Sequence, residues 1–334
     1  MPVIERTRIL VDCSFASRFG QIGRPVKVDD FNRRLTGFLS SPEGMRFITA
    51  TLEKLAGRPV SGAAGIRATM FQQGYFQFVF RVDIKTRSGI PKRFCLIVSK
   101  GNPQFDTDRI AEDEFKLLSH YYQRLPGFLV EPLVFDRTDL VLYSSRYYSD
   151  HLELDYKIDG VNGRHGLYIN SDRAFRPFSG KEQDRLLEEM VKILVLAYDE
   201  SSGIAIGGLK VSSGDFIVKS ERERLDLKLI CVRSAERRKI PAFICDLLEY
   251  TIGLSTHQGF LFDVTTIHNG LVKAFLHNGL SKEAAVHKAT HWMSQYQQAL
   301  ERGELDSLKR FWATLRYEAG LDGLPVYRHK RTDV

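Results

Sequence analysis

The chain has 334 residues and a mass of 38.2 kDa, with 43% hydrophobic and 27% charged residues. This near-average composition excludes a disordered or low-complexity chain, and the length suits one large bilobed fold or two modest domains. Lys and Arg number 48 against 41 Asp and Glu, a formal net charge of +7 that permits an acidic partner without specifying one.

The sequence shows no feature of a membrane or secreted protein. Mean hydropathy is -0.22, and no apolar run reaches the roughly 18 residues that span a bilayer. The first ten residues lack the charged start, apolar stretch and cleavage site of a secretory signal. Cys13, Cys95, Cys231 and Cys245 form no CxxC pair, which argues against a zinc ribbon. We therefore expect a cytoplasmic protein with reduced thiols and no membrane partner.

Residues 1–60 are predicted to form an N-terminal extension. A short strand is expected over 7–11, followed by two helices within 28–56. Ser41 and Pro42 supply the cap and first position of the second helix. The first helix shows apolar residues at helical spacing, namely Val28, Phe31, Leu35 and Phe38. Its helices are expected either to pack on the neighbouring lobe or to dock a partner.

Residues 61–148 are predicted to form a small lobe built on an antiparallel sheet. Apolar side chains alternate with other side chains between Phe76 and Val82, which is typical of a strand, and turn signals flank this run. A further strand is expected over 93–100, then a helix over 108–123 and strands near 128–135 and 139–147. The strand pattern begins at Ile66, so three consecutive strands joined by tight turns are expected to form an antiparallel meander. One inserted helix and two more strands follow.

Residues 149–334 are predicted to form a larger, mostly helical lobe. A capping box of Ser179 and Glu182 begins a helix that runs to Tyr198. The segment 151–176 is rich in Asp, Gly and Asn, so we expect a long loop there. The remaining predicted elements are short strands over 216–219 and 227–232 and helices near 241–253, 263–278, 282–300 (capped by Ser281) and 304–319.

This order of elements resembles the α+β, bilobed protein-kinase-like fold. The stretch 197–236 is similar to the protein-kinase segment that runs from a long helix through the catalytic loop to the Asp-Phe-Gly motif. Within it, residues 209–210 match the family's Leu-Lys, 215–218 match the metal-binding position and its strand, and 227–230 match the strand before the magnesium ligand.

The upstream residues resemble the aminoglycoside phosphotransferase and choline kinase branch of that superfamily. Gly74 matches the turn that covers the phosphates, Lys100 the lysine of the third strand, and Glu114 the helix glutamate that pairs with this lysine. Tyr148 matches the hinge that holds adenine, and Asp215 a metal ligand. The resemblance implies an ATP cleft, in which catalysis depends on positioning and charge neutralisation.

The sequence differs from the family at the positions of the catalytic and metal-binding residues. Gly208 occupies the place of the catalytic Asp, and Cys231 replaces the magnesium-binding Asp of Asp-Phe-Gly. A thiol is a poor ligand for a hard cation, so only Asp215 remains as a weak candidate metal ligand. We therefore expect no catalytic residue. The cleft is expected either to bind ATP without turnover or to bind no cofactor. The leading hypothesis is a pseudoenzyme that acts as a scaffold or regulatory partner of another protein.

Two other functions stay open. The first is an active, atypical ATP-dependent phosphotransferase that recruits Asp199, Asp215 or Asp226 as its carboxylate. The second is a non-enzymatic protein that binds an acidic surface or nucleic acid through basic side chains, although no zinc-finger or RNP-type motif accompanies them. These basic residues are Arg233, Arg237, Arg238 and Lys239, together with the C-terminal segment 327–331.

The helix predicted near 282–300 carries two histidines that suggest, more weakly, a metal site. His287 and His291 lie four residues apart and share a helix face, which suits a pair of metal ligands. The HKATH sequence lacks the Glu of the HExxH motif, and no third ligand is identifiable. We expect these histidines to be ordinary surface residues.

Overall fold

A computed structural model describes residues 8–13, 28–60, 63–73, 76–86, 91–102, 105–159, 164–170, 175–177, 180–207, 215–221, 224–255 and 264–305. The chain is α+β, as predicted, and divides into two compact units. The first comprises Met1–Leu152, Ile206–Gly208 and Phe216–Ala235. The second comprises Glu153–Ala205, Leu209–Asp215 and Glu236–Val334. The predicted extension and small lobe therefore belong to one unit.

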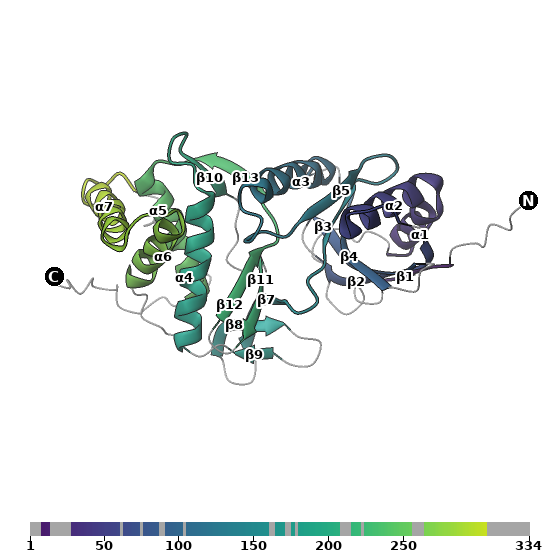
Figure 1. Cartoon of the computed structure of the whole chain (residues 1–334), viewed down its shortest axis with the longest axis horizontal. Helices are drawn as coiled ribbons and strands as arrows, with labels where there is room; N and C mark the ends of the chain where they lie inside the picture. Colours follow the sequence, from purple (N-terminus) through teal and green to yellow (C-terminus); the bar gives the residue numbers. More distant parts are fainter. Residues whose placement is uncertain are drawn as a thin grey trace, which may run out of the picture. The chain divides into compact units, whose positions relative to one another are not determined.

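The first unit contains one large sheet, three helices and a hairpin (Figure 1). In chain order its elements are β1 (Arg8–Asp12), α1 (Val28–Ser40), α2 (Pro42–Ala56), β2 (Ala63–Gln73), β3 (Gln77–Thr86), β4 (Pro91–Ser99), α3 (Thr107–Arg124), β5 (Pro132–Asp136), β6 (Leu142–Arg146), β11 (Phe216–Glu221) and β12 (Arg224–Leu229).

The large sheet has six strands in the order β1-β2-β3-β4-β6-β5. The predicted meander of β2, β3 and β4 is confirmed, as is the insertion of α3 between β4 and β5. The sheet is mixed rather than purely antiparallel, because β1 runs parallel to β2 in a register that pairs Arg8 with Gly65. The antiparallel expectation missed this pairing because a parallel neighbour is distant in sequence.

One face of this sheet packs against α1 and α2. Alternate β3 side chains from Phe78 to Ile84 are buried on it, since successive strand residues point to opposite faces. The Phe31 ring of α1 lies 4.5 Å from that of Phe78, measured between centroids. Thr51 of α2 hydrogen-bonds Ser144 of β6 at 2.9 Å. Both predicted helices are therefore part of the sheet's hydrophobic core, and Ser41 caps α2 as expected.

The opposite face is covered by α3 at β4, β5 and β6. Asp106, in the left-handed region with φ 42°, caps this helix by accepting a bond from the Arg109 amide. Ser99 Oγ at the end of β4 donates to Thr107 Oγ1 at 2.9 Å, which fixes the first turn of α3 to the sheet.

The predicted short strands near 216 and 227 form the antiparallel hairpin of β11 and β12, in which Phe216 pairs with Leu229. Leu229 also exchanges backbone hydrogen bonds with the segment after α3, at 2.8 Å with Phe128 and 3.0 Å with Val130. The hairpin is thereby joined to the first unit by main-chain bonds.

The second unit combines helices with a small antiparallel sheet. Its elements are β7 (Leu152–Asp159), β8 (Arg164–Asn170), β9 (Phe175–Pro177), α4 (Gly180–Ala197), α5 (Ile240–Ser255), α6 (Val264–His277) and α7 (Lys282–Glu301). Two further short strands, β10 (Ile204–Gly207) and β13 (Ser234–Arg237), contain residues of both units.

The loop expected over 151–176 is wrong, because β7 pairs with β8 and β8 with β9 there. The Asp- and Gly-rich composition concealed a period-two pattern of apolar residues at Leu152, Leu154, Tyr156 and Ile158, which is the strand signal. The helices predicted to begin near 180, 241, 263 and 282 are confirmed, with Ser281 capping the last.

An aromatic cluster joins the helices of the second unit. Tyr198 stacks on Phe243 at 4.4 Å, and the Trp292 ring meets Phe275 edge to face at 5.1 Å. Trp292, 2% exposed, therefore lies in the core. Most of the helix expected over 304–319 lies outside the described residues. Among those described, no helix is long and apolar enough to cross a membrane.

Candidate functional site

The structure places the carboxylate of Glu114 between the sheet and α3. The residue is only 5% exposed; its Oε1 accepts a hydrogen bond from the Tyr143 hydroxyl and its Oε2 one from the Gln77 side-chain amide, both at 2.9 Å. Burial, reinforced by the neighbouring Glu114, raises the pKa of Tyr143 well above its ordinary value, so the hydroxyl stays a donor at neutral pH.

Lys100 lies on the other face of the same sheet. It follows β4, and its ammonium lies 5.0 Å from the centroid of the Phe78 ring, a member of the core that α1 and α2 cover. Glu114 contacts the sheet from the α3 side through Tyr143 and Gln77. The structure therefore does not bring Lys100 and Glu114 together, because the sheet separates them.

Tyr148 lies at the far end of the β4–β6 ladder from Lys100. In that ladder Val98 pairs with Leu142 and Phe94 pairs with Arg146. Tyr148 follows Arg146, whereas Lys100 follows Val98 by two residues. The two residues are thus about eight positions apart along the ladder, which at about 3.3 Å per residue is roughly 26 Å. Within the first unit, Lys100 and Tyr148 are therefore not placed to contact the phosphates and the adenine of one nucleotide.

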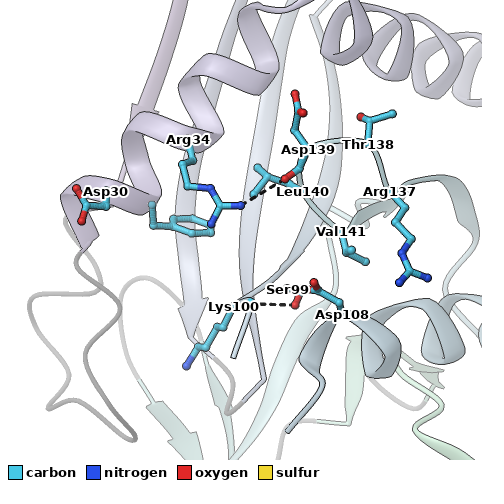
Figure 2. A pocket seen from close by; sticks show the side chains of 12 residues that line it. Asp30, Arg34, Ser99, Lys100, Asp108, Arg137, Thr138, Asp139, Leu140 and Val141 are labelled. Carbon is cyan, nitrogen blue, oxygen red and sulfur yellow. Dashed lines mark hydrogen bonds between the residues drawn. The ribbon is translucent and has the colours of Figure 1, made fainter. Parts of the chain in front are cut away.

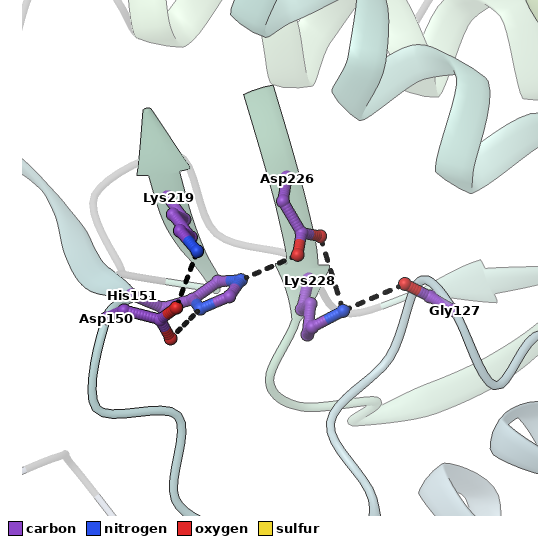
Figure 3. A network of polar contacts seen from close by, with 6 residues as sticks. All are labelled: Gly127, Asp150, His151, Lys219, Asp226 and Lys228. Carbon is purple, nitrogen blue, oxygen red and sulfur yellow. Dashed lines mark hydrogen bonds and ion pairs between the residues drawn. The ribbon is translucent and has the colours of Figure 1, made fainter. Parts of the chain in front are cut away.

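Tyr148 instead contacts Lys228, which belongs to a polar cluster between β11, β12 and the segment after β6. Figure 3 shows this cluster. The His151 side chain, 4% exposed, lies between two carboxylates: Nδ1 is 3.2 Å from Asp150 Oδ1 and Nε2 is 3.2 Å from Asp226 Oδ2. The Nε2 atom makes no hydrogen bond, so the second contact is a close approach of the two side chains rather than a directed bond.

Two lysines complete this cluster. Lys219 pairs with Asp150 at 2.7 Å, and this hydrogen bond lowers the Asp150 pKa to about 2. Lys228 donates to the Gly127 carbonyl at 3.0 Å, pairs with Asp226 at 3.3 Å and lies 5.2 Å from the Tyr148 ring centroid. Lys228 therefore already lies over the Tyr148 ring, where a planar ligand would stack.

The other predicted site residues have mixed outcomes. Cys231 and Asp215 are both buried, at 8% and 1% exposure, so neither presents its side chain openly to a ligand. Gly74 and Gly208 lie outside the described residues, and so does the basic segment 327–331.

The two remaining candidate carboxylates have local structural roles. Asp199 accepts hydrogen bonds from the Ser202 and Ser201 hydroxyls at 2.6 and 2.7 Å, which lower its pKa to about 2 and form a turn after α4. Asp226 belongs to the cluster around His151 described above. Both carboxylates are therefore engaged within their own units.

The basic residues after β12 are partly neutralised. Arg238 pairs with Asp246 at 2.7 Å and with Glu236, and it accepts a bond from the Tyr198 hydroxyl through its backbone carbonyl. Arg237 and Lys239 are exposed. The predicted cluster thus offers less unpaired positive charge than its sequence suggests.

A cavity of about 250 Å³ opens beside Lys100, on the α1 side of the first unit (Figure 2). Its lining comes from the start of α1, the end of β4, the first turn of α3 and the loop over 137–141. Arg34 donates to the Asp139 carbonyl at 3.3 Å, and Arg137 pairs with Glu112 at 2.5 Å. Sequence reasoning missed this cavity because its residues lie far apart along the chain.

Lys100 is a half-buried cation in the lining of this cavity. Desolvation by burial lowers the pKa of its ammonium below 10.5, because removal from water disfavours the charged form. No carboxylate within the described ranges pairs with it. Asp108 and Asp139 add negative charge to the same lining, so the cavity is of mixed sign.

We expect Lys100 to be acylated with a pH midpoint below 10.5, since the neutral amine is the nucleophile. The measurement is the extent of modification by an amine-reactive ester at increasing pH, quantified by peptide mass spectrometry. Exposed Lys85, on the other face of the sheet, is the internal reference. A midpoint for Lys100 at or above 10.5 would contradict the burial argument.

No group of three or more His, Cys, Asp or Glu side chains able to hold a metal ion occurs in the part of the chain that the structure describes. His291 hydrogen-bonds Gln295 at 2.7 Å on the surface of α7. In comparisons with known proteins, no family model and no curated protein sequence matches this chain.

Proposed function

We propose that the protein is a pseudoenzyme with a kinase-like order of elements, which acts as a scaffold or regulatory binding protein for another protein. The order of β2, β3, β4, α3, β5 and β6 supports the resemblance inferred from the sequence. The bilobed kinase-like arrangement is part of this proposal.

The position of Lys100 carries the proposal. Phosphoryl transfer needs a cation at the nucleotide phosphates and a carboxylate that holds it there. Here the sheet separates Lys100 from Glu114, and Glu114 accepts hydrogen bonds from two uncharged side chains. Cys231 and Gly208 at the two acidic positions support the same conclusion from the sequence. Losing a general base alone typically costs a factor of about 10² to 10⁴ in rate.

The test is a thermal-shift titration with ATP, with and without Mg²⁺, together with a phosphotransfer assay. We expect a shift below about 2 °C, equivalent to less than about 1 kcal/mol, and no transfer above background. Lys100→Met and the matched surface variant Lys85→Met are expected to behave alike. Transfer that Lys100→Met abolishes and Lys85→Met retains would overturn the proposal in favour of an active phosphotransferase.

A further inference from the structure

The half of the large sheet that α3 leaves uncovered presents a cluster of basic side chains on β2, β3 and β4. The positions of the basic residues follow from strand alternation, since their neighbours Ala68, Val82 and Phe94 point into the core with α1 and α2. Phe71 is the extra residue of a β-bulge between Met70 and Gln72 of β2. We define the arginine face as Arg67, Phe71, Arg81, Lys85 and Arg93. Arg67 and Lys85 are exposed, and Phe71 is 36% exposed.

Asp83 holds the arginines of this face in place. It lies opposite Arg67 on one side and Arg93 on the other in the strand register. Its Oδ2 is 3.1 Å from Arg81 Nε, and its Oδ1 is 2.5 Å from Arg93 Nε. The Arg93 guanidinium also lies 5.2 Å from the centroid of the Tyr147 ring. Because Arg93 meets Asp83 through Nε, its terminal NH₂ groups can still donate to a second acceptor.

The face carries an excess of positive charge. It has four basic side chains and two carboxylates, Asp83 and Asp12 of the edge strand β1, so its net charge is +2. Alternate residues of β3 lie roughly 6.6 Å apart and neighbouring strands about 4.8 Å apart, so the cations form an array rather than a single point charge. An array of this kind is complementary to a polyanion with regularly spaced charges, and arginine forks match phosphate geometry.

We propose that the arginine face binds single-stranded nucleic acid. The exposed Phe71 ring favours this polyanion over an acidic polypeptide, because an aromatic side chain beside a basic surface provides a platform on which a base stacks. The proposal uses different residues from the predicted basic cluster at 233–239. It also stands independently of the proposed pseudoenzyme function, since it requires neither ATP nor Lys100.

The test measures binding of a fluorescein-labelled oligouridine of about 12 nucleotides by fluorescence anisotropy over a range of salt concentrations. With three or four phosphates neutralised, the slope of log K against log salt is expected to be about -2 to -3. The double variant Arg67→Gln with Lys85→Gln should weaken binding roughly tenfold and flatten the slope. The matched control, Arg46→Gln with Arg58→Gln, removes the same charge on the α2 side of the sheet.

A second pair of variants tests stacking. Phe71→Ala should weaken binding roughly fivefold or more, while Phe105→Ala, which removes a ring of 44% exposure outside the arginine face, should leave it unchanged. Thermal unfolding confirms that each variant folds. Three outcomes overturn the proposal: no binding at low salt, equal losses in both double variants, or tight binding of polyglutamate that Phe71→Ala does not affect.

Discussion

Replacing Phe31 by alanine is expected to destabilise the first unit by about 3–5 kcal/mol, the cost of truncating a buried phenylalanine in a packed core. Phe31 is 3% exposed, and its ring lies 4.5 Å from that of Phe78 and 6.0 Å from that of Phe80. The alanine would leave a cavity between α1 and the sheet. The measurement is urea unfolding followed by far-UV circular dichroism, with hydrogen exchange of β2, β3 and β4 to locate the effect.

The control is Phe105→Ala, which removes a ring of 44% exposure and should change stability by about 0.5 kcal/mol or less. If Phe31→Ala cost no more than this control, α1 would be an accessory element and residues 1–60 a separable extension. A large cost instead makes the helices an obligatory cover for the sheet, so truncated chains that begin after residue 60 would expose the apolar face and aggregate.

Gly270→Ala is expected to destabilise the second unit by about 1–3 kcal/mol through overpacking. A Cβ atom at this position of α6 would lie 2.5 Å from Val191 Cγ1 and 3.0 Å from the Glu188 carbonyl oxygen of α4. Asn269 and Lys273 also hydrogen-bond Glu188 and Glu189, so the two helices cannot separate easily. Trp292, 2% exposed, lies in the core of this unit, so tryptophan fluorescence during urea unfolding reports on it.

Two companion variants separate the clash from the intrinsic effect of alanine. Gly37→Ala in α1, where no atom lies within 4 Å of the added Cβ, should stabilise by about 0.5–1 kcal/mol, because glycine is the poorer helix former. Adding Val191→Ala to Gly270→Ala should recover only part of the lost stability, because it removes the Cγ1 contact at 2.5 Å but keeps the Val191 Cβ at 2.6 Å. A Gly270→Ala protein as stable as the parent would show that α4 and α6 pack less closely than described.

The elements that sequence periodicity located best are those with one buried face. The alternation from Phe76 to Val82 correctly predicted a strand, and the helical spacing from Phe31 to Phe38 correctly predicted a helix. Both predictions hold because a half-buried element must repeat its apolar residues at the period of its own geometry. The caps at Ser41 and Ser281 were equally local, since each side chain bonds an amide three residues away. The strands after Leu152 were missed because polar and glycine residues dominate their composition.

Which residues share a site depended on contacts between distant segments. Lys100 and Glu114 are only 14 positions apart, yet the face to which each points follows from the register of β4 and the packing of α3. The salt bridge of Asp83 with Arg93 likewise depends on the pairing of β3 with β4. A shift of one residue in a strand would reverse the face of every side chain on it.

The sequence by itself determined the α+β class and the strand–helix–strand order of the first unit. These follow from local periodicity and residue chemistry. Only the tertiary structure decided that α1 and α2 share the core of the sheet, that Lys100 and Glu114 lie on opposite faces, and that the arginine face is exposed. These depend on long-range pairing and burial, for which the free energy is distributed over many distant residues.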